Sequence, residues 1–231
     1  MALTGYFPEN IGVFTQIDSV FDLIFYMVFP WLVLTELIVV VFSVLYRKKP
    51  SRKATYEPGV RFKALSWILV PAVVVLGFDL YMDFAGASVW HHMKEQVPAE
   101  GLTVGVNGKQ FAWTFTLPGA DQILHTADDI KIENDLHVPA DKNIIFELQS
   151  NDVIHSFFIP NIRIKQDVVP GRRIRGWFQA KKPGRYEIAC AELCGIGHTR
   201  MRGWLNVHDP VEYETWIKQT IEKQSAEDSW L

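Results

Sequence analysis

Cysteine is nearly absent from this sequence: the 231 residues include only two, Cys190 and Cys194. Two thiols cannot build a multiply bridged disulfide scaffold, nor supply the ligands of a four-cysteine zinc or iron–sulfur site. The haem-attachment pattern C-x-x-C-H is also missing, so we expect no haem on this chain. Net charge is low as well, with 23 Lys and Arg against 26 Asp and Glu. That balance provides no positive field for nucleic acid.

Long apolar runs, by contrast, are prominent near the N-terminus. Two runs, about 21–46 and 65–84, approach or exceed the roughly 20 apolar residues that cross a bilayer. We therefore predict a hairpin of two transmembrane helices. A pair of buried core helices is the alternative, but no other segment is apolar enough to surround them. Pro30 and Pro71 lie within the runs and are tolerated where neighbouring protein satisfies the freed carbonyls.

The loop between the runs, residues 47–63, is rich in Lys and Arg. By the positive-inside rule this loop is expected in the cytoplasm, with both chain termini outside. Residues 1–20 contain neither the basic residues of a signal peptide nor a cysteine for lipid attachment, so an uncleaved anchor is expected. The predicted location is a bacterial-type inner (plasma) membrane, which the chain crosses more than once.

Three carboxylates, Asp22, Glu36 and Asp79, lie at or inside the predicted spans. An ionised carboxylate at that depth is costly unless it faces protein or water. A structural helix contact and a role in a proton path are both compatible with this pattern. In either case the hairpin is expected to pack against another membrane subunit, because two helices cannot bury these faces alone.

Residues 92–208 change to short β-type runs separated by turn residues, roughly six to eight of them. This spacing predicts an antiparallel sandwich or a Greek-key barrel outside the membrane. Asp209 and Pro210 form a helix start, and Tyr213, Trp216 and Ile217 fit one face of a C-terminal helix. The predicted domains are a hairpin over 1–96 and an extracytoplasmic domain over 97–231.

Residues able to bind a metal gather near the end of the β region. They are Cys190, Glu192, Cys194, His198 and Met201, with His155 further upstream. Thiolate, imidazole and thioether together favour copper by ligand softness, whereas calcium and magnesium prefer oxygen. Zinc is a competitor with two cysteines and two histidines, although the usual paired spacings are missing and Met201 would have no role. A structural disulfide is the simplest alternative for the two cysteines alone.

A mononuclear blue-copper site takes one thiolate, and this motif has one too many. Two cysteines on one loop can instead bridge two coppers, with one histidine completing each metal. The pattern H…C-x-E-x-C-x3-H-x2-M, after a two-helix hairpin, resembles subunit II of haem-copper cytochrome c oxidase. The stretch 155–172, HSFFIPNIRIKQDVVPGR, resembles the same family's segment after the first histidine. The implied fold class is an α+β membrane protein with a hairpin and a cupredoxin-like Greek-key β-barrel.

The resemblance also implies a dinuclear copper centre, CuA, in this chain. Its ligands would be His155, Cys190, Glu192, Cys194, His198 and Met201. Glu192 would contribute its backbone carbonyl, and its side chain would reach a magnesium or manganese ion at the boundary with subunit I. The chain would accept electrons from a c-type cytochrome and pass them to haem in subunit I. Oxygen would be reduced to water there, coupled to proton translocation, with other membrane subunits and the lipid bilayer as further partners.

The sequence departs from the family pattern at two places. Family members have a tryptophan directly after the residue equivalent to Gln110, where electrons enter, and this chain has Phe111 there and Trp113 two residues later. Either aromatic residue could take that role, or both could be core residues of one strand. Many members also carry a glutamate at the position of Ala64, near a proton path, and Glu57 is a possible substitute.

Two acidic features are candidates for docking a basic cytochrome. Asp152 precedes His155 by three residues, where resembling subunits have an acid beside the copper. Residues 119–135 resemble an acidic insertion that could steer a cytochrome, bind calcium or simply be solvated. The remaining histidines lack a partnered motif and are expected to be surface or core residues.

Other functions remain open from the sequence alone. The CuA subunit of a nitric oxide reductase would look similar locally, and would differ in its catalytic partner. A membrane-anchored copper-binding or copper-transfer protein would need an exposed, exchangeable site.

Overall fold

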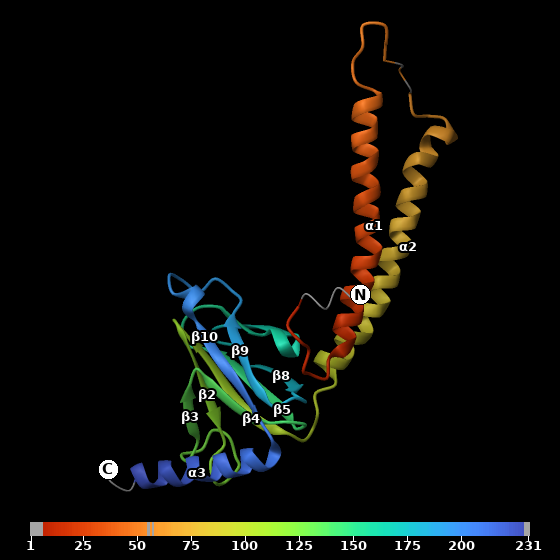
Figure 1. The fold of residues 1–231 in the computed structure, drawn as a ribbon. Coiled ribbons are helices and arrows are strands. Elements are labelled where there is room, and N and C mark those ends of the chain that lie inside the picture. The colour runs from red at the N-terminus through yellow and green to blue at the C-terminus, as the bar shows by residue number, and fades with distance from the viewer. Residues whose placement is uncertain (1–6, 55, 57, 229–231) are drawn as a thin grey trace. The chain divides into compact units, whose positions relative to one another are not determined.

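The computed structural model describes residues 7–54, 56 and 58–228. They form two compact units, which are described separately (Figure 1). The first unit, over Gln16–Trp90, is helical. The second combines Phe7–Thr15 with the chain from His91 onward and is mainly β-structure.

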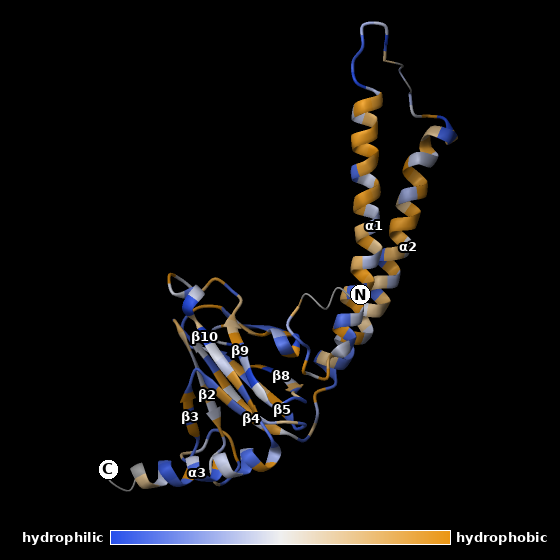
Figure 2. Ribbon diagram, viewed as in Figure 1, coloured by the Kyte–Doolittle hydropathy of each residue, from blue (hydrophilic) through white to orange (hydrophobic). Residues whose placement is uncertain are grey.

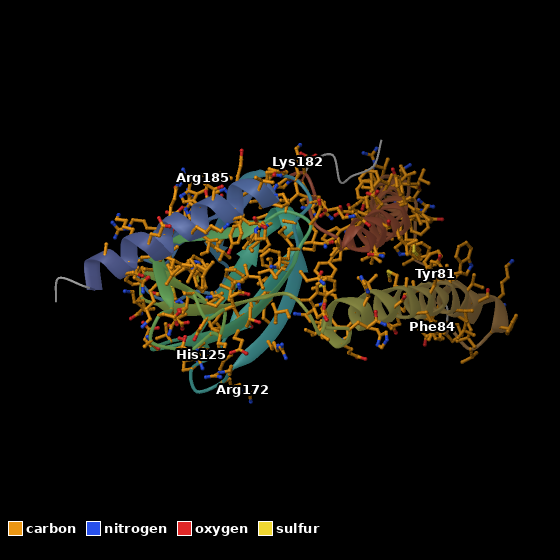
Figure 3. All side chains as sticks on the ribbon, turned by 90° about the horizontal axis from the view of Figure 1, so that it is seen from below. Tyr81, Phe84, His125, Arg172, Lys182 and Arg185 are labelled. Carbon is orange, nitrogen blue, oxygen red and sulfur yellow. The ribbon has the colours of Figure 1, made fainter. Side chains whose placement is uncertain are left out.

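The helical unit consists of α1, Thr15–Leu45, and α2, Phe62–Trp90. Both are long and apolar enough to cross a membrane, with mean hydropathies of 2.4 and 1.9 over their most apolar stretches. Neither helix has a buried residue, so the apolar residues that Figure 2 shows along both helices need lipid or another protein to cover them. Tyr81 and Phe84, for example, are exposed on α2 (Figure 3).

The two helices extend beyond the predicted spans at both outer ends. The apolar runs started at 21 and ended at 84, whereas α1 begins at Thr15 and α2 continues to Trp90. Pro30 and Pro71 lie inside the helices, which continue past them. Ala64 is in the first turn of α2, and Glu57, the possible substitute for the family's glutamate, lies outside the described residues.

The β unit contains ten strands in the described part of the chain, arranged in two five-stranded sheets. The first sheet has the order β3-β2-β1-β5-β8 and the second β4-β10-β9-β6-β7. Their bounds are β1 Leu102–Lys109, β2 Ala112–Leu117, β3 Ile130–Glu133, β4 Asp135–Pro139, β5 Asn143–Ser150, β6 His155–Ile159, β7 Ile164–Val168, β8 Ile174–Gln179, β9 Gly184–Cys190 and β10 Arg202–His208. Short helical turns cover His91–Glu95, Pro160–Ile162 and His198–Arg200.

The core lies between the two sheets, because residues that point inward alternate with residues that point outward. On β10, for example, Gly203, Leu205 and Val207 are buried and their neighbours are not. Aromatic rings fill much of this core, and Phe157 contacts both Phe115 and Phe146. The result is a cupredoxin-like sandwich, so the predicted fold class of hairpin plus cupredoxin-like domain is confirmed.

The sheets are mixed, which corrects the expectation of an all-antiparallel sandwich. β1 pairs with β5 in parallel, and β10 pairs with β4 in parallel. A tight hairpin joins only antiparallel neighbours, so parallel pairs require the chain to leave one strand and return by a longer connection. Short strand-like runs in a sequence carry no signal for such pairings.

The segment Phe7–Thr15 packs against the β unit, although the sequence analysis assigned residues 1–96 to the hairpin. Gly12 forms a β-bridge with Ala180, and Lys181 N–H donates to the Ile11 carbonyl at 2.8 Å. Ile11 and Phe14 are buried, and the Phe14 ring lies 5.1 Å from that of Trp177. The segment is too short to be recognised from its own sequence as part of a domain that begins some 75 residues later.

Helix α3, Pro210–Asp228, follows β10 and begins where the sequence predicted. Asp209 caps it, because its carboxylate accepts a hydrogen bond from Val211 N–H at 3.1 Å. Trp216 stacks on the ring of His137 at a centroid distance of 4.1 Å. His137 Nδ1 in turn lies 2.8 Å from His208 Nε2, so these two histidines form one contact cluster beneath the helix.

We predict that this cluster makes the β unit less stable in mild acid. Burial and the neighbouring His208 lower the pKa of His137 to about 4, from 6.5 in the unfolded chain. The unfolded state therefore binds more protons between those values, and stability present above pH 6.5 is lost as the pH falls toward 4. The loss should be roughly 1–2 kcal/mol after allowance for solvent screening. Denaturant unfolding of the detergent-solubilised chain across this pH range measures it.

The His137→Asn variant should lose stability less steeply between pH 6.5 and 4. The matched control is His125→Asn, since His125 is exposed on the loop after β2. An unchanged pH slope in His137→Asn would contradict the prediction.

Candidate metal centre

Strand pairing in the second sheet brings the predicted metal ligands together. His155 is the first residue of β6 and Cys190 the last of β9, and these strands pair with Phe157 opposite Cys190. The chain then loops through residues 191–201 and returns as β10, which pairs with β9. This ligand loop, residues 191–201, carries the other ligand candidates. The pairing of β6 with β9 makes His155 and Cys190, 35 positions apart in the sequence, neighbours at one end of the sandwich.

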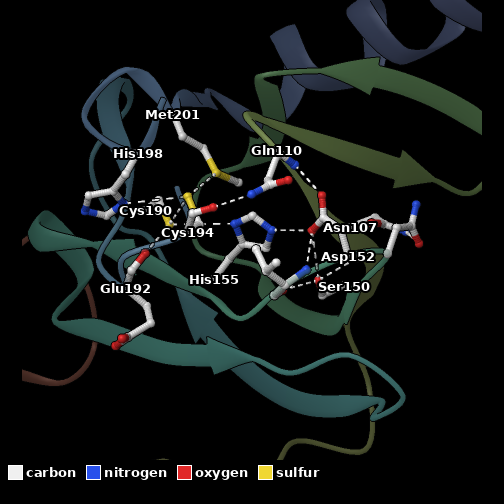
Figure 4. A network of polar contacts seen from close by, with 12 residues as sticks. Asn107, Gln110, Ser150, Asp152, His155, Cys190, Glu192, Cys194, His198 and Met201 are labelled. Carbon is white, nitrogen blue, oxygen red and sulfur yellow. Dashed lines mark hydrogen bonds and ion pairs between the residues drawn. The ribbon is translucent and has the colours of Figure 1, made fainter. Parts of the chain in front are cut away.

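The two thiols lie at the centre of the site, and each has its own histidine (Figure 4). Cys190 Sγ is 3.9 Å from His155 Nδ1, and Cys194 Sγ is 3.7 Å from His198 Nδ1. The two sulfur atoms are 3.8 Å apart. The Met201 thioether sulfur lies 3.7 Å from Cys194 Sγ. All five side chains thus direct a soft donor atom or an imidazole nitrogen toward one small volume.

Four of the five donor side chains are shielded from water, and His198 is partly exposed. The exposed fractions of Cys190, Cys194 and Met201 are 8%, 3% and 1%, and His155 is completely buried. Both cysteines are free thiols, and their sulfur separation is far above the roughly 2.05 Å of a disulfide. The structure therefore differs from the disulfide alternative.

This donor set fits two soft metal ions better than one tetrahedral ion. A single zinc ion would draw four donors within roughly 3.5–4 Å of one another. Here the ligand atoms of His155, Cys190 and Cys194 lie within 4.8 Å of one another, and His198 is outside that group. One histidine beside each thiol, with a thioether at the second thiol, suits a pair of copper ions bridged by sulfur.

The site disfavours the thiolate form of Cys194 in the absence of a cation. Burial and the neighbouring Cys190 thiol raise the pKa of Cys194 to about 11. A metal ion supplies the positive charge that stabilises the thiolate, so metal uptake would release protons.

Glu192 lies between the two cysteines and presents two different groups. Its backbone carbonyl accepts a hydrogen bond from the Cys190 thiol at 3.2 Å. Its side chain is exposed, and its carboxylate points away from the sulfur atoms (Figure 4). The carbonyl is thus directed at the donor cluster, while the carboxylate is available to another partner.

Asp152 orients the ring of His155. The imidazole Nε2–H donates to Asp152 Oδ1 at 2.8 Å, which leaves Nδ1 facing Cys190. Burial alone would raise the pKa of Asp152, but hydrogen bonds from His155 and from the N–H groups of Gln110 and Val153 outweigh it and lower that pKa. The carboxylate therefore stays ionised and is held within the site. Asp152 was predicted only as a docking residue, although the D-x-x-H spacing was a sequence signal for its hydrogen bond to His155.

The two aromatic candidates occupy different positions beside the donors. Trp113 is completely buried, and its ring makes an edge contact with that of His155 at a centroid distance of 5.9 Å. Phe111 is partly exposed and packs on the backbone of Gly195 and Gly197, since a Cβ atom built on Gly197 would lie 2.4 Å from its ring. Only Phe111 of this pair combines surface exposure with contact to the ligand loop.

Two residues that shape the site were not predicted from the sequence to do so. Gly108 on β1 lies directly against His155, because a Cβ atom there would be 2.9 Å from the imidazole Cδ2. Gln110 hydrogen-bonds to the carbonyl of Cys194 at 2.5 Å. The only sequence signal for Gln110 was its position close to Phe111 and Trp113. That position does not indicate a hydrogen bond to Cys194, 84 residues later.

The acidic insertion lies away from the donors. β2 begins at Ala112 beside the ligand loop and runs about 15–20 Å to Leu117, after which the insertion starts. Residues of the insertion border a groove together with Tyr213 and Ile217 of α3. Part of the predicted insertion is β3. Its charges are therefore poorly placed to steer a partner to the thiols.

Comparisons with known proteins identify relatives of the chain. Residues 102–206 match the family model described as cytochrome c oxidase subunit II, periplasmic domain. The alternative cytochrome c oxidase subunit 2 of Bradyrhizobium diazoefficiens is 34% identical over 197 residues, covering 75% of this chain and 69% of the relative. The cytochrome c oxidase subunit 2 of Synechocystis is 40% identical over 123 residues, or 53% of this chain and 34% of that protein.

Among solved structures, the crystal structure of the periplasmic domain of subunit II of cytochrome oxidase from Bradyrhizobium japonicum is 28% identical. It covers 55% of this chain and 99% of that one, with a TM-score of 0.49.

We predict that the Gly108→Ala substitution weakens metal binding by displacing His155. The added methyl group would meet the imidazole at 2.9 Å and the Trp113 ring at 3.3 Å, and neither buried ring has room to move. Displacement of a ligand's ring should lower copper affinity by about 10-fold or more. Copper titration of the purified full-length chain measures this. Gly77→Ala on α2, where nothing lies within 4 Å, is the control, and equal affinities for both variants would contradict the prediction.

Proposed function

The chain belongs to the cytochrome c oxidase subunit II family, and we propose that it is the electron-entry subunit of a respiratory haem-copper oxidase. It accepts electrons from a c-type cytochrome and passes them to haem in subunit I. Oxygen is reduced to water in that subunit, coupled to proton translocation. The observation that carries the proposal is the buried pair of thiols with one histidine beside each and a thioether beside the second.

The proposed cofactor is a dinuclear copper centre, CuA. Its ligands are His155, Cys190, Glu192 through its carbonyl, Cys194, His198 and Met201. A pair of copper ions held by these residues would spread each change of charge over both metals and several ligands, so that little rearrangement would accompany electron transfer. Burial of the donors supports this role, because a relay works best where water does not reorganise around it.

The protein's own part in the relay is to hold these donors in place. Asp152 fixes the His155 ring so that Nδ1 faces Cys190, and Gly108 lets the β1 backbone pack against the same ring. No substrate pocket or general base is needed for this function. The reaction with oxygen is assigned to the partner subunit.

Glu192 is proposed to serve the boundary with subunit I as well. Its carbonyl faces Cys190 and its exposed carboxylate faces away, which would allow one residue to contact both copper and a magnesium or manganese ion. A carboxylate oxygen is the type of ligand that these harder ions prefer.

Phe111 is proposed as the point at which electrons enter, in the place of the family's tryptophan. It is partly exposed and packs on the loop that carries Cys194 and His198, whereas Trp113 is fully buried behind His155. Asp152 remains partly accessible, with 29% of its side chain exposed, so it can add negative charge near the docking surface while orienting His155.

The proposed location is a bacterial-type inner (plasma) membrane, with the copper domain and both termini on the outer side. The apolar surfaces of α1 and α2 support membrane insertion, and the basic loop 47–63 supports this orientation. Glu36 and Asp79 on these helices would then face other membrane subunits.

A copper-transfer role is the less favoured candidate. Transfer to another protein requires donors that the partner can reach, and only His198 among the side-chain ligands is partly exposed. A CuA subunit of a nitric oxide reductase would have the same local site. The assembled partner subunit and its reaction distinguish that alternative.

We predict that Cys190→Ser and His198→Ala each abolish the dinuclear centre. Each substitution removes one ligand, and Cys190→Ser also removes a bridging sulfur. Wild-type protein loaded with copper should contain about two copper ions per chain, with an electron paramagnetic resonance spectrum of one unpaired electron shared by both.

The variants should lose that spectrum and oxidation of cytochrome c by the assembled oxidase, while still inserting into the membrane. Retention of the shared-electron spectrum in either variant would refute the ligand assignment.

We predict that Phe111→Ala slows electron entry into the chains that hold the copper centre. Loss of the ring opens a gap between the surface and the ligand loop, and Phe111→Trp should restore or increase the rate. Stopped-flow reduction by cytochrome c measures the effect, with the copper spectrum as the check on the centre. Equal rates in wild type and Phe111→Ala, with intact copper, would mean that electrons enter elsewhere.

A further inference from the structure

The turn between β1 and β2 contacts both halves of the donor set. Only Gln110 and Phe111 separate the two strands. The backbone N–H of Gln110 donates to Asp152 Oδ2 at 2.7 Å, and its side-chain Nε2 donates to the Cys194 carbonyl at 2.5 Å (Figure 4). One residue thus hydrogen-bonds to two segments that are 42 positions apart in the sequence.

Each of these two contacts leads directly to a donor atom. Asp152 uses its other carboxylate oxygen to hold His155 Nε2, at 2.8 Å. The Cys194 carbonyl belongs to the same residue as the second thiol, which lies beside His198. The hydrogen bonds therefore run from His155 through Asp152 and Gln110 to Cys194. They connect the side of the site with Cys190 and His155 to the side with Cys194 and His198.

The backbone of the ligand loop is shaped to receive the Gln110 side chain. Gly195 follows Cys194 and has φ +130°, a conformation that residues with a side chain rarely adopt. A Cβ atom at Gly195 would lie 2.9 Å from Gln110 Nε2. The glycine thus permits the close approach of the amide to the loop, in addition to the hydrogen bond itself.

The loop also needs a support of this kind. Leu193 and Ile196, on either side of Cys194 and Gly195, are exposed, so Cys194 is the one side chain of these four residues that packs into the β unit. A hydrogen bond from the rigid end of β1 to the Cys194 carbonyl limits the movement of the thiol relative to His155. Phe111 adds to this support by covering Gly195 and Gly197.

We propose that Gln110 is a positioning residue that fixes the distance between the two halves of the copper-binding donor set. This inference rests on the proposed function, since it concerns the same donors. Gln110 acts through Asp152 on His155 and through the carbonyl on Cys194, and does not itself bind metal. It keeps the two thiols and their histidines arranged alike whether or not copper is bound.

The test compares Gln110→Ala and Gln110→Glu with wild type in the full-length, detergent-solubilised chain. Both variants lack the side-chain N–H, and both keep the backbone N–H that binds Asp152. Glu also keeps the size of the side chain, so it remains informative if the alanine variant folds poorly. The control is Gln179→Ala, which removes a similar amide-to-carbonyl hydrogen bond, to Asp141 at 2.8 Å, on the distant end of β8.

Three readouts follow the site, two in the copper-loaded protein and one in the metal-free protein. In the copper-loaded protein, both Gln110 variants should release copper to a chelator about 10-fold faster or more. Their electron paramagnetic resonance spectrum should show an unpaired electron that is shared unequally by the two coppers. In the metal-free protein, Cys194 should react faster with a thiol-alkylating reagent, because the loop moves more freely. Gln179→Ala should match wild type in all three.

The outcomes separate this inference from the proposed function. A wild-type chain that shows the shared-electron spectrum, with Gln110 variants that match it in spectrum, copper release and alkylation, overturns the positioning role alone. Equal changes in Gln179→Ala would overturn it too, because they would reflect general loss of stability. A wild-type chain that never forms the dinuclear centre overturns both the proposed function and this inference.

Discussion

The pairing of β6 with β9 is the constraint on which the rest of the site depends. It places His155 beside Cys190, and the inward face of these strands is also the face that fills the core with Phe157 and Ile188. A slip by one residue would turn both donors to the outer face and expose the aromatic core at the same time. The energy that packs the sandwich, roughly 1.5–3 kcal/mol for each large buried side chain, therefore also holds the donors in register.

How much the sequence predicted depends on the distance along the chain between interacting residues. Five of the six candidate ligands lie within twelve positions, and the apolar runs that form α1 and α2 are continuous, so both features were visible. The C-terminal helix was predicted from its local cap at Asp209. The contacts of Gln110 with Cys194, of Gly108 with His155 and of β1 with β5 in parallel join distant segments, and no local pattern specifies them. The resemblance predicted Asp152 as a docking residue but not its hydrogen bond to His155. For the insertion, the sequence left steering, calcium binding and a solvated loop open, and could not show that it borders a groove with α3.

Rigid surroundings for the donors come from several weak contacts rather than from one strong interaction. The Asp152 carboxylate, the Gln110 amide, the close approach at Gly108 and the Phe111 ring each restrict a different donor or loop atom. Such contacts cost conformational entropy when the protein folds, before any metal is bound. Because the donor residues are already ordered when the protein folds, they do not have to be ordered again each time an electron arrives. This division between folding and function suits a relay, in which speed depends on small structural change.

The bridge between Gly12 and Ala180 has a consequence for the order in which the protein can be made. The ribosome completes the N-terminal segment first and β8 much later, with both apolar helices in between. Until β8 is available, Ile11 and Phe14 have no core to enter and remain exposed. The β unit therefore cannot close during early synthesis, and chains that stop before β8 would display a short apolar segment near their N-terminus. Such a segment would distinguish unfinished from finished chains for chaperones and proteases.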